Sequence, residues 1–373
     1  MKYWKTIAIV LVLLLAVTLF GACSPGTTTE EPADNAATQE AAPEATEETP
    51  AETAATEETP AEGDAAESGG GGYDYHLGVI QPGPESYYQN YADSVKAAAE
   101  YAGMKVTSLL AEYSAETEIA NVEDLISQGV DAIAVFSVAS DTAQVDAQLC
   151  NEADIPLFLM SSTASEGTGV PTCTIGNSFY DMGKMDGDWV VENMEGEVKV
   201  LEIQGALGQG VAELHSEGFA DAIAARDDIE VVYQQTANWV RADAIAITED
   251  SLMSDLDFNM VFVHNEDMCA GVVSVLEENG EIGNINVVTM NGSNDGIQMI
   301  KDGKILATCA NPPSYVGGDV VVQIMKFFDG ADVPATFDSP TFMIDSGNAS
   351  APDLVTWDKE WAIARVDEYL ASK

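Results

Sequence analysis

The densest cluster of reactive side chains in the sequence follows a short apolar run. Residues 261–271 read VFVHNEDMCAG, and the members capable of chemistry are His264, Asn265, Glu266, Asp267 and Cys269. Such side chains could hold a metal ion, transfer protons or form hydrogen bonds to a ligand. Metal binding and hydrolysis are disfavoured, because the other histidines, at 76 and 215, are scattered and neither HExxH nor GxSxG is present. We therefore expect no metal, no cofactor and no catalytic residue.

A strand followed by a helix explains the same stretch better. The run 261–263 predicts a buried strand, and polar residues directly after a strand lie where open sheets bind ligands, so Asn265 is expected to face a site. Glu266 and Asp267 fit the first turn of the next helix, where the helix dipole favours negative charge. The cysteine spacings suggest neither a metal site nor disulfides. We expect buried free thiols at Cys150, Cys173, Cys269 and Cys309.

Two kinds of segment alternate along the chain and must position these residues. Short β-rich runs, such as HLGVIQP at 76–82 and DAIAVFS at 131–137, alternate with amphipathic stretches such as SYYQNYADSVKAAAEYA at 86–102. Continuous apolar strands alternating with helices predict parallel sheets covered on both faces. The pattern restarts midway, which predicts an α/β fold of two doubly wound lobes. A further amphipathic helix over 315–328 must pack on one of them.

Polar, mostly uncharged residues mark the expected carboxyl ends of the strands. They are Gln81, Ser161, Ser162, Gly205, Gln209, Asn238, Trp239, His264, Asn265, Asn291, Gly292 and Asn311. Because doubly wound sheets bind ligands at these ends, they predict a site rich in amides and low in charge. An amide both donates and accepts hydrogen bonds without carrying a charge.

The start of the chain predicts export. Lys2 and Lys5 precede an apolar run of about 14 residues, which is too short for a comfortable membrane span. Cys23 resembles the lipidated cysteine of a bacterial lipobox, although Phe20 stands where Leu is more usual; a plain signal peptide with a chance cysteine is the alternative. Residues 24–72 contain 13 acidic residues and no Lys or Arg, which predicts a disordered acidic tether. Lipid on Cys23 would then be an anchor.

The charge of the chain disfavours two classes of partner. The formal net charge is −49, and from residue 73 onward 50 acidic residues stand against 12 basic ones, a net charge of −38. A surface this acidic repels phosphate backbones and anionic membranes, so we expect neither nucleic acid nor charge-driven membrane binding. The 301 residues from Tyr73 to Lys373 are enough for two domains.

Six strings, in order along the chain, resemble the type I periplasmic binding proteins, in particular their ribose/galactose-like sugar-binding group. The strings are PESYYQNYADSVKAAAEYAG, IANVEDLISQGVDAIAVF, LEIQGALGQGVAELHSEGFADAI, VFVHNEDMCAG, VVTMNGSNDG and ILATCANPP. The resemblance covers nearly all of 75–350. It implies two α/β lobes joined by three crossovers, with one small ligand clamped between them.

The resemblance also implies boundaries and partners. An N-terminal lobe would comprise 73–177 plus 312–342, and a C-terminal lobe 178–311 plus 343–373. Hinges would lie near Asn177-Ser178, Asn311-Pro312 and Phe342-Met343. Residues 1–23 would be a lipoprotein signal peptide, and the mature protein a monomer on the outer face of the cell membrane. Its partners would be the permease and ATPase subunits of an ABC importer.

Matching the family's ligand-contacting positions one by one implies a set of ligand-binding residues. They are Tyr87, Tyr88, Ser161, Ser162, His215, Trp239, Asn265, Asn291 and Asn311. Relatives often have Asp or Arg where this chain has Ser161-Ser162, His215 and Asn291, so less fixed charge is expected here. Most of these residues also have a structural interpretation. It is helix core for one tyrosine, an exposed or hinge-packing position for Trp239, turn chemistry for Asn265 and Asn291, spacing for the serines, and a packed helix position for His215.

We therefore expect a substrate-binding protein, not an enzyme, whose ligand is a small neutral sugar, most simply a monosaccharide. A binder of a nucleoside or a small polyol-like signal on the same fold is the first alternative, because low charge and Trp239 stacking would suit it equally. A secreted α/β enzyme is the second, although no nucleophile–base pair stands out. If His215 lies in the site, ligand affinity should change between pH 5 and 7.

Overall fold

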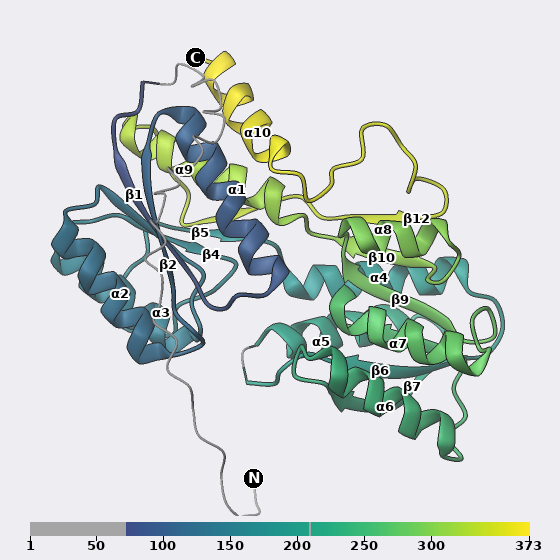
Figure 1. Cartoon of the computed structure of the whole chain (residues 1–373). Helices are drawn as coiled ribbons and strands as arrows, with labels where there is room; N and C mark the ends of the chain where they lie inside the picture. Colours follow the sequence, from purple (N-terminus) through teal and green to yellow (C-terminus); the bar gives the residue numbers. More distant parts are fainter. Residues whose placement is uncertain (1–71, 209) are drawn as a thin grey trace, which may run out of the picture. The chain divides into compact units, whose positions relative to one another are not determined.

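The structure, a computed structural model, describes residues 72–208 and 210–373 (Figure 1). The predicted signal peptide, Cys23 and residues 24–71 of the predicted tether lie outside the described residues. Two six-stranded sheets with flanking helices account for the described chain, which agrees with the predicted two-lobed α/β class. No helix in the described ranges is both long and apolar enough to cross a membrane.

The first sheet has the strand order β11-β5-β4-β3-β1-β2, and every neighbouring pair is parallel. Its strands are β1 (His76–Gln81), β2 (Lys105–Leu110), β3 (Ala132–Val135), β4 (Leu157–Met160), β5 (Cys173–Gly176) and β11 (Thr336–Asp338). The helices between these strands are α1 (Ser86–Ala102), α2 (Ala115–Gln128) and α3 (Ser140–Glu152). We call this sheet and the helices packed on it the first lobe.

The second sheet repeats the arrangement, with the order β12-β10-β9-β8-β6-β7. Its strands are β6 (Val198–Gln204), β7 (Ile229–Thr236), β8 (Met260–Val263), β9 (Asn286–Asn291), β10 (Ala307–Ala310) and the antiparallel edge strand β12 (Phe342–Asp345). Its helices are α4 (Phe179–Asn193), α5 (Val211–Ile223), α6 (Arg241–Met253), α7 (Glu266–Asn279) and α8 (Asn294–Lys301). Together they form the second lobe.

The direction of strand progression reverses once in each sheet. In the first sheet the reversal lies between β1 and β3, and in the second it lies between β6 and β8. Ligands of doubly wound sheets bind beyond the carboxyl ends of the strands at such a reversal. In the second sheet, Gly205 follows β6 and Asn265 lies between β8 and α7. Both residues therefore lie at the reversal of that sheet.

Local sequence sets where the helices begin and end. The Ser114 hydroxyl accepts a hydrogen bond of 3.1 Å from the Thr117 amide at the start of α2, which satisfies one of the amides that a helix leaves unpaired. Gly129 ends α2 with φ of 72°, and Gly103 ends α1 with φ of 99°. Glycine adopts this left-handed conformation without the strain that a side chain would add.

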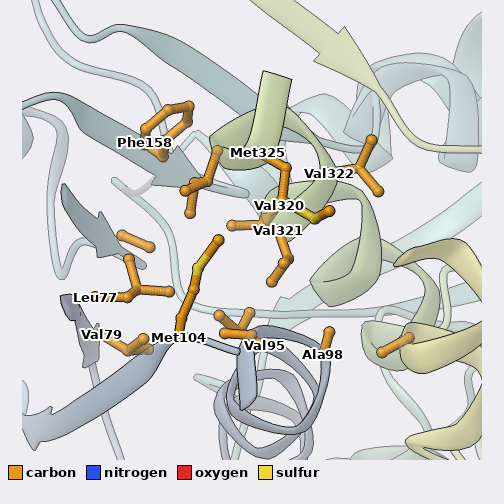
Figure 2. Close-up of a cluster of buried hydrophobic side chains, with 14 of the residues drawn as sticks. Leu77, Val79, Val95, Ala98, Met104, Phe158, Val320, Val321, Val322 and Met325 are labelled. Atoms are coloured by element: carbon orange, nitrogen blue, oxygen red, sulfur yellow. The ribbon is translucent and has the colours of Figure 1, made fainter. Parts of the chain in front are cut away.

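The helix predicted over 315–328 is α9 (Pro313–Phe328). It packs in the first lobe although all the strands from β1 to β10 precede it in the sequence. Figure 2 shows Val320, Val321 and Met325 of α9 facing Val95 of α1 and Leu77 of β1. These side chains are fully buried, and burial of each contributes about 1.5–3 kcal/mol. The first lobe thus needs residues from both halves of the sequence to complete its core.

The C-terminal residues require a correction to the predicted boundaries. After β12 the chain leaves the second sheet through residues 346–359, which we call the strap, and enters α10 (Glu360–Ala371). α10 lies along α1 and α9, so it belongs to the first lobe and not to the C-terminal lobe to which all of 343–373 was assigned (Figure 1). The chain therefore passes between the sheets near the three predicted places and a fourth time through the strap. An amphipathic pattern indicates that a helix packs, but not on which lobe.

Polar contacts secure two of these passages and the end of the chain. The Asn177 side chain donates a 2.9 Å hydrogen bond to the Ser339 carbonyl, which ties the first crossover to the third. At the end of α10, the hydroxyls of Tyr73 and Tyr369 each donate to the Asp329 carboxylate at 2.7 Å, and the Lys373 ammonium contacts the same carboxylate. The first and last described segments are thus joined at the end of α9.

Candidate functional site

A row of hydrogen bonds joins predicted site residues from both lobes. The Asn291 side chain donates to the Asn311 amide oxygen at 3.2 Å, and the Asn311 side chain donates to the Tyr87 hydroxyl at 3.0 Å. Asn291 ends β9 and Asn311 follows β10, whereas Tyr87 lies in the first turn of α1. The structure therefore brings three of the nine predicted residues into direct contact.

Tyr87 and Tyr88 lie edge-on to each other, with ring centroids 6.0 Å apart, and differ in their other partners. The Tyr87 ring lies edge-on to the ring of Trp357, with centroids 5.6 Å apart, and its hydroxyl reaches Asn311. The Tyr88 ring lies edge-on to Phe136, which follows β3, at 4.9 Å. Both rings are half-buried. Burial raises the pKa of both phenols, that of Tyr88 to about 12, so both stay protonated at neutral pH.

Ser161 and Ser162 shape the loops after the strands of the first sheet. Ser161 is buried with φ of 45°, a left-handed conformation, and its amide donates to the Ile175 carbonyl at 2.7 Å. The hydroxyl of Ser162 accepts a 3.2 Å hydrogen bond from the Ser137 amide. Ser161 thus faces the interior beside Gly176, and Ser162 supports the loop that carries Phe136.

Asn265 combines a structural role with an unused donor. Its side-chain oxygen accepts a 2.8 Å hydrogen bond from the Met268 amide and caps α7. Its Nδ2 makes no hydrogen bond with any residue in the described ranges 72–208 and 210–373. The turn chemistry considered for Asn265 therefore accounts for one half of its amide, and the other half can serve a ligand.

Glu266 does more than the predicted favourable charge at a helix start. Its buried carboxylate accepts hydrogen bonds from the amides of Gly292 at 2.9 Å and Ser293 at 2.6 Å, and from the Thr308 hydroxyl at 2.7 Å. Burial raises the pKa of Glu266 to about 7, although these donors oppose the shift. The carboxylate therefore fixes the turn directly after Asn291, a role that the spacing of the sequence did not reveal.

Asn291 has a strained backbone held by several contacts. Its φ is 127°, a region that glycine favours. Its side-chain oxygen accepts from the Glu266 amide at 3.3 Å, and its carbonyl accepts from the Asn311 amide at 3.2 Å and from the indole of Trp357 at 3.3 Å. Strain of this kind costs about 1–3 kcal/mol and persists only where surrounding groups enforce it. Asn291 is therefore a positioned group and not a simple turn residue.

Trp239 lies on the backbone of Gly205, beside the reversal point of the second sheet. A Cβ atom at Gly205 would come within 2.1 Å of the indole ring, so only glycine leaves room for Trp239 there. The ring is half-buried, and its centroid lies 6.4 Å from that of His264. His264 is buried: its Nε2 contacts Glu202 at 2.9 Å and its Nδ1 accepts from the Gly205 amide at 3.4 Å. His264 is thus a support for the Gly205 loop.

The structure places His215 in the interior of the second lobe. Its ring contacts Phe179 and His264, with centroid distances of 5.5 and 5.3 Å, and both ring nitrogens are buried without a hydrogen-bond partner. Burial, aided by His264, holds the pKa of His215 well below 6.5. The imidazole therefore stays neutral, and the expectation that it changes affinity between pH 5 and 7 loses its basis.

Three further observations complete the description of the site. Trp357, in the strap, was not among the predicted residues, yet it touches both Tyr87 and Asn291. No motif or periodicity in the sequence marked it. Among the described residues no group of three or more His, Cys, Asp or Glu side chains is arranged to hold a metal ion. Cys150, Cys173, Cys269 and Cys309 are buried thiols.

Comparison with known proteins places this architecture in a family. The model of a family described as periplasmic binding protein domain matches residues 77–332. The ribose import binding protein of Salmonella typhimurium is 28% identical over 259 residues, which cover 69% of this chain and 86% of the relative. The galactofuranose-binding protein of Escherichia coli is 28% identical over 253 residues, covering 65% of this chain and 78% of the relative.

Solved structures give the same result. A protein from Mycobacterium smegmatis in complex with β-D-fucofuranose has a TM-score of 0.71 and 27% identity, covering 79% of this chain and 98% of its own. An ABC transporter solute-binding protein from the same organism, with bound glycerol, has a TM-score of 0.69 and 26% identity, covering 74% of this chain and 96% of its own. The chain therefore belongs to the periplasmic binding protein domain family, and within it to the type I, ribose-like sugar-binding group.

Proposed function

We propose that this protein is the extracytoplasmic substrate-binding protein of an ABC importer and that it binds a small neutral sugar between its two lobes. The observation that carries this proposal is the row Asn291–Asn311–Tyr87, in which amides at the strand ends of the second sheet meet a phenol of the first lobe. The relatives support the ligand class, because their names specify ribose, galactofuranose and fucofuranose.

The chemistry of the row suits hydroxyl groups. Amides and a phenol both donate and accept, so each can pair with a sugar hydroxyl without a change of protonation. The rings of Trp239 and Tyr87 provide flat apolar faces for sugar C–H groups, one from each lobe. The nearby ionisable groups His264 and Glu266 are occupied by contacts within the protein. A neutral ligand therefore meets no uncompensated charge.

The remaining elements of the proposal concern location and partners. Lipid on Cys23 would anchor the protein outside the cytoplasmic membrane, and residues 24–72 would act as the tether. The folded part would act as a monomer, close its lobes on the ligand by a hinge motion, and deliver it to the permease of an importer driven by an ATPase. The relatives are binding proteins, which supports transport and not turnover.

A thermal-shift screen of the full chain in detergent tests the ligand class. The probes are D-ribose, D-galactose and D-fucose as neutral sugars, glycerol and myo-inositol as polyols, and adenosine and uridine as nucleosides. A ligand at 100 times its dissociation constant adds about 2.7 kcal/mol to the free energy of unfolding. We expect a neutral sugar to give the largest shift. A shift with polyols or nucleosides alone would support the alternative ligand class, and no shift with any probe would contradict the proposal.

A further inference from the structure

The strap brings one aromatic side chain to the point where the two lobes meet. Trp357 lies edge-on to Tyr87 of the first lobe, with ring centroids 5.6 Å apart, and its indole N–H donates to the Asn291 carbonyl of the second lobe at 3.3 Å. These are two of the three residues in the hydrogen-bonded row. The strap also lies beyond residues 77–332, which match the family model.

The end of the strap is fixed to the first lobe. The Asn90 side chain of α1 donates to the Trp357 carbonyl at 2.8 Å, and the Ser314 hydroxyl of α9 donates to the Thr356 carbonyl at 2.6 Å. Trp357 therefore follows α1 and α9, and hence Tyr87, whenever the lobes move. Its hydrogen bond to Asn291 is the contact that reaches the other lobe.

The strap packs on the second lobe through Ala349, which is buried in that lobe's core, and through the half-buried Leu354. A cavity of about 570 Å³ is lined by both the strap and α8, including Ile297 and Lys301 of α8 and Leu354 of the strap. The contacts of Trp357 join the strap to the hydrogen-bonded row. The cavity lies between the strap and α8 instead.

We propose that Trp357 is a positioning residue for the ligand site, holding the Tyr87 ring and the strained Asn291 backbone in the geometry that the ligand requires. This inference rests on the proposed function. Without the indole, Tyr87 loses one edge contact, and the Asn291 carbonyl keeps only the 3.2 Å hydrogen bond from the Asn311 amide. The ligand would then have to order these groups when it binds, and ordering of side chains weakens association.

The test compares Trp357→Ala, Trp357→Phe and the matched control Trp361→Ala in the full chain. Trp361 lies four positions further along and lines the cavity instead of touching the row. With the tightest-binding sugar of the panel D-ribose, D-galactose and D-fucose, we expect Trp357→Ala to bind about tenfold more weakly, through faster dissociation. Trp357→Phe keeps the ring but not the N–H donor, so its affinity should be intermediate, and Trp361→Ala should bind as the wild type does.

A second readout needs no ligand. The Asn311 amide donates to the same Asn291 carbonyl, so its exchange with deuterium should be about tenfold faster in both Trp357 variants and unchanged in Trp361→Ala. Equal affinity of Trp357→Ala and wild type would overturn the inference, and so would equal weakening by Trp357→Ala and Trp361→Ala. If no sugar binds the wild type, the proposed function fails; unchanged Asn311 exchange in the Trp357 variants would separately refute the positioning role.

Discussion

Glu266 provides a quantitative test of how the site is held. Its carboxylate binds the turn after Asn291 through Gly292, Ser293 and Thr308, and it does so in a buried position. The substitution Glu266→Gln keeps the shape of the side chain and removes its ionisation. A pH dependence of stability that differs between the two proteins therefore reports on the ionisation of this carboxyl group.

The magnitude follows from linkage between protonation and folding. The pKa of Glu266 is raised from 4.5 to about 7 in the folded protein, with burial as the main cause. Between these values the folded protein binds a proton that the unfolded chain has released, so stability falls as pH rises. The full difference is about 3 kcal/mol, because each unit of pKa corresponds to about 1.4 kcal/mol. This stabilisation is complete below pH 4.5 and is lost as pH rises through about 7.

Urea denaturation at pH 4.5 and pH 8 measures this quantity. Urea is uncharged, so it leaves electrostatic interactions unscreened. We expect the free energy of unfolding of the wild type, relative to Glu266→Gln, to decrease by about 3 kcal/mol from the lower to the higher pH. Burial, and to a lesser extent the charge of Glu266, raises the pKa of Asp186, so the comparison is repeated with Asp186→Asn in both proteins to remove the titration of that group. A difference that stays constant within about 0.5 kcal/mol, or that grows with pH, would refute the reasoning.

Three further predictions concern single side chains. Asn265→Asp should keep the cap to the Met268 amide, and therefore a melting temperature within about 2 °C of wild type. Its sugar affinity should fall about tenfold because the Nδ2 donor is lost. A thermal melt and a calorimetric titration of each protein test this, and unchanged affinity would remove Asn265 from the site. Gly205→Ala should displace the Trp239 ring, because the new Cβ would lie 2.1 Å from it. This substitution should weaken sugar binding as much as Trp239→Ala does. Wild-type affinity of Gly205→Ala in calorimetry would contradict this placement of Trp239. His215→Phe should stabilise the protein by about 1 kcal/mol in urea denaturation, because it removes two unpaired buried nitrogens. This gain in stability should grow as pH falls below 6.5, because only the unfolded histidine is protonated there. Destabilisation would show that the imidazole has a partner.

The two-sheet core follows from local sequence. Strands such as β8 (Met260–Val263) are continuously apolar because helices cover both faces of a parallel sheet, and the amphipathic helices between them end at residues such as Gly129. The short strand β11 (Thr336–Asp338) carries no apolar run and was not predicted. It forms only because it pairs with β5, which lies far away in the sequence.

The site was predictable in part for a related physical reason. Asn265, Asn291 and Asn311 are strand-end residues, and parallel strands bring such ends together whatever the loops do. The orientation of His215, on a helix, depends on the packing of α5 against α4, which no periodicity specifies. Trp357 joins the site through a contact across 270 residues of sequence with Tyr87, and only the three-dimensional path of the strap reveals it.

The central claim is that one small neutral sugar is held by residues of both lobes. Calorimetric titration of the best-binding sugar into wild type, Tyr87→Ala and Trp239→Ala tests it most directly, because the two substitutions remove one ring from each lobe. We predict that each variant binds at least about tenfold more weakly than wild type, with one site per chain. Wild-type affinity in either variant would place the ligand within a single lobe and contradict the account.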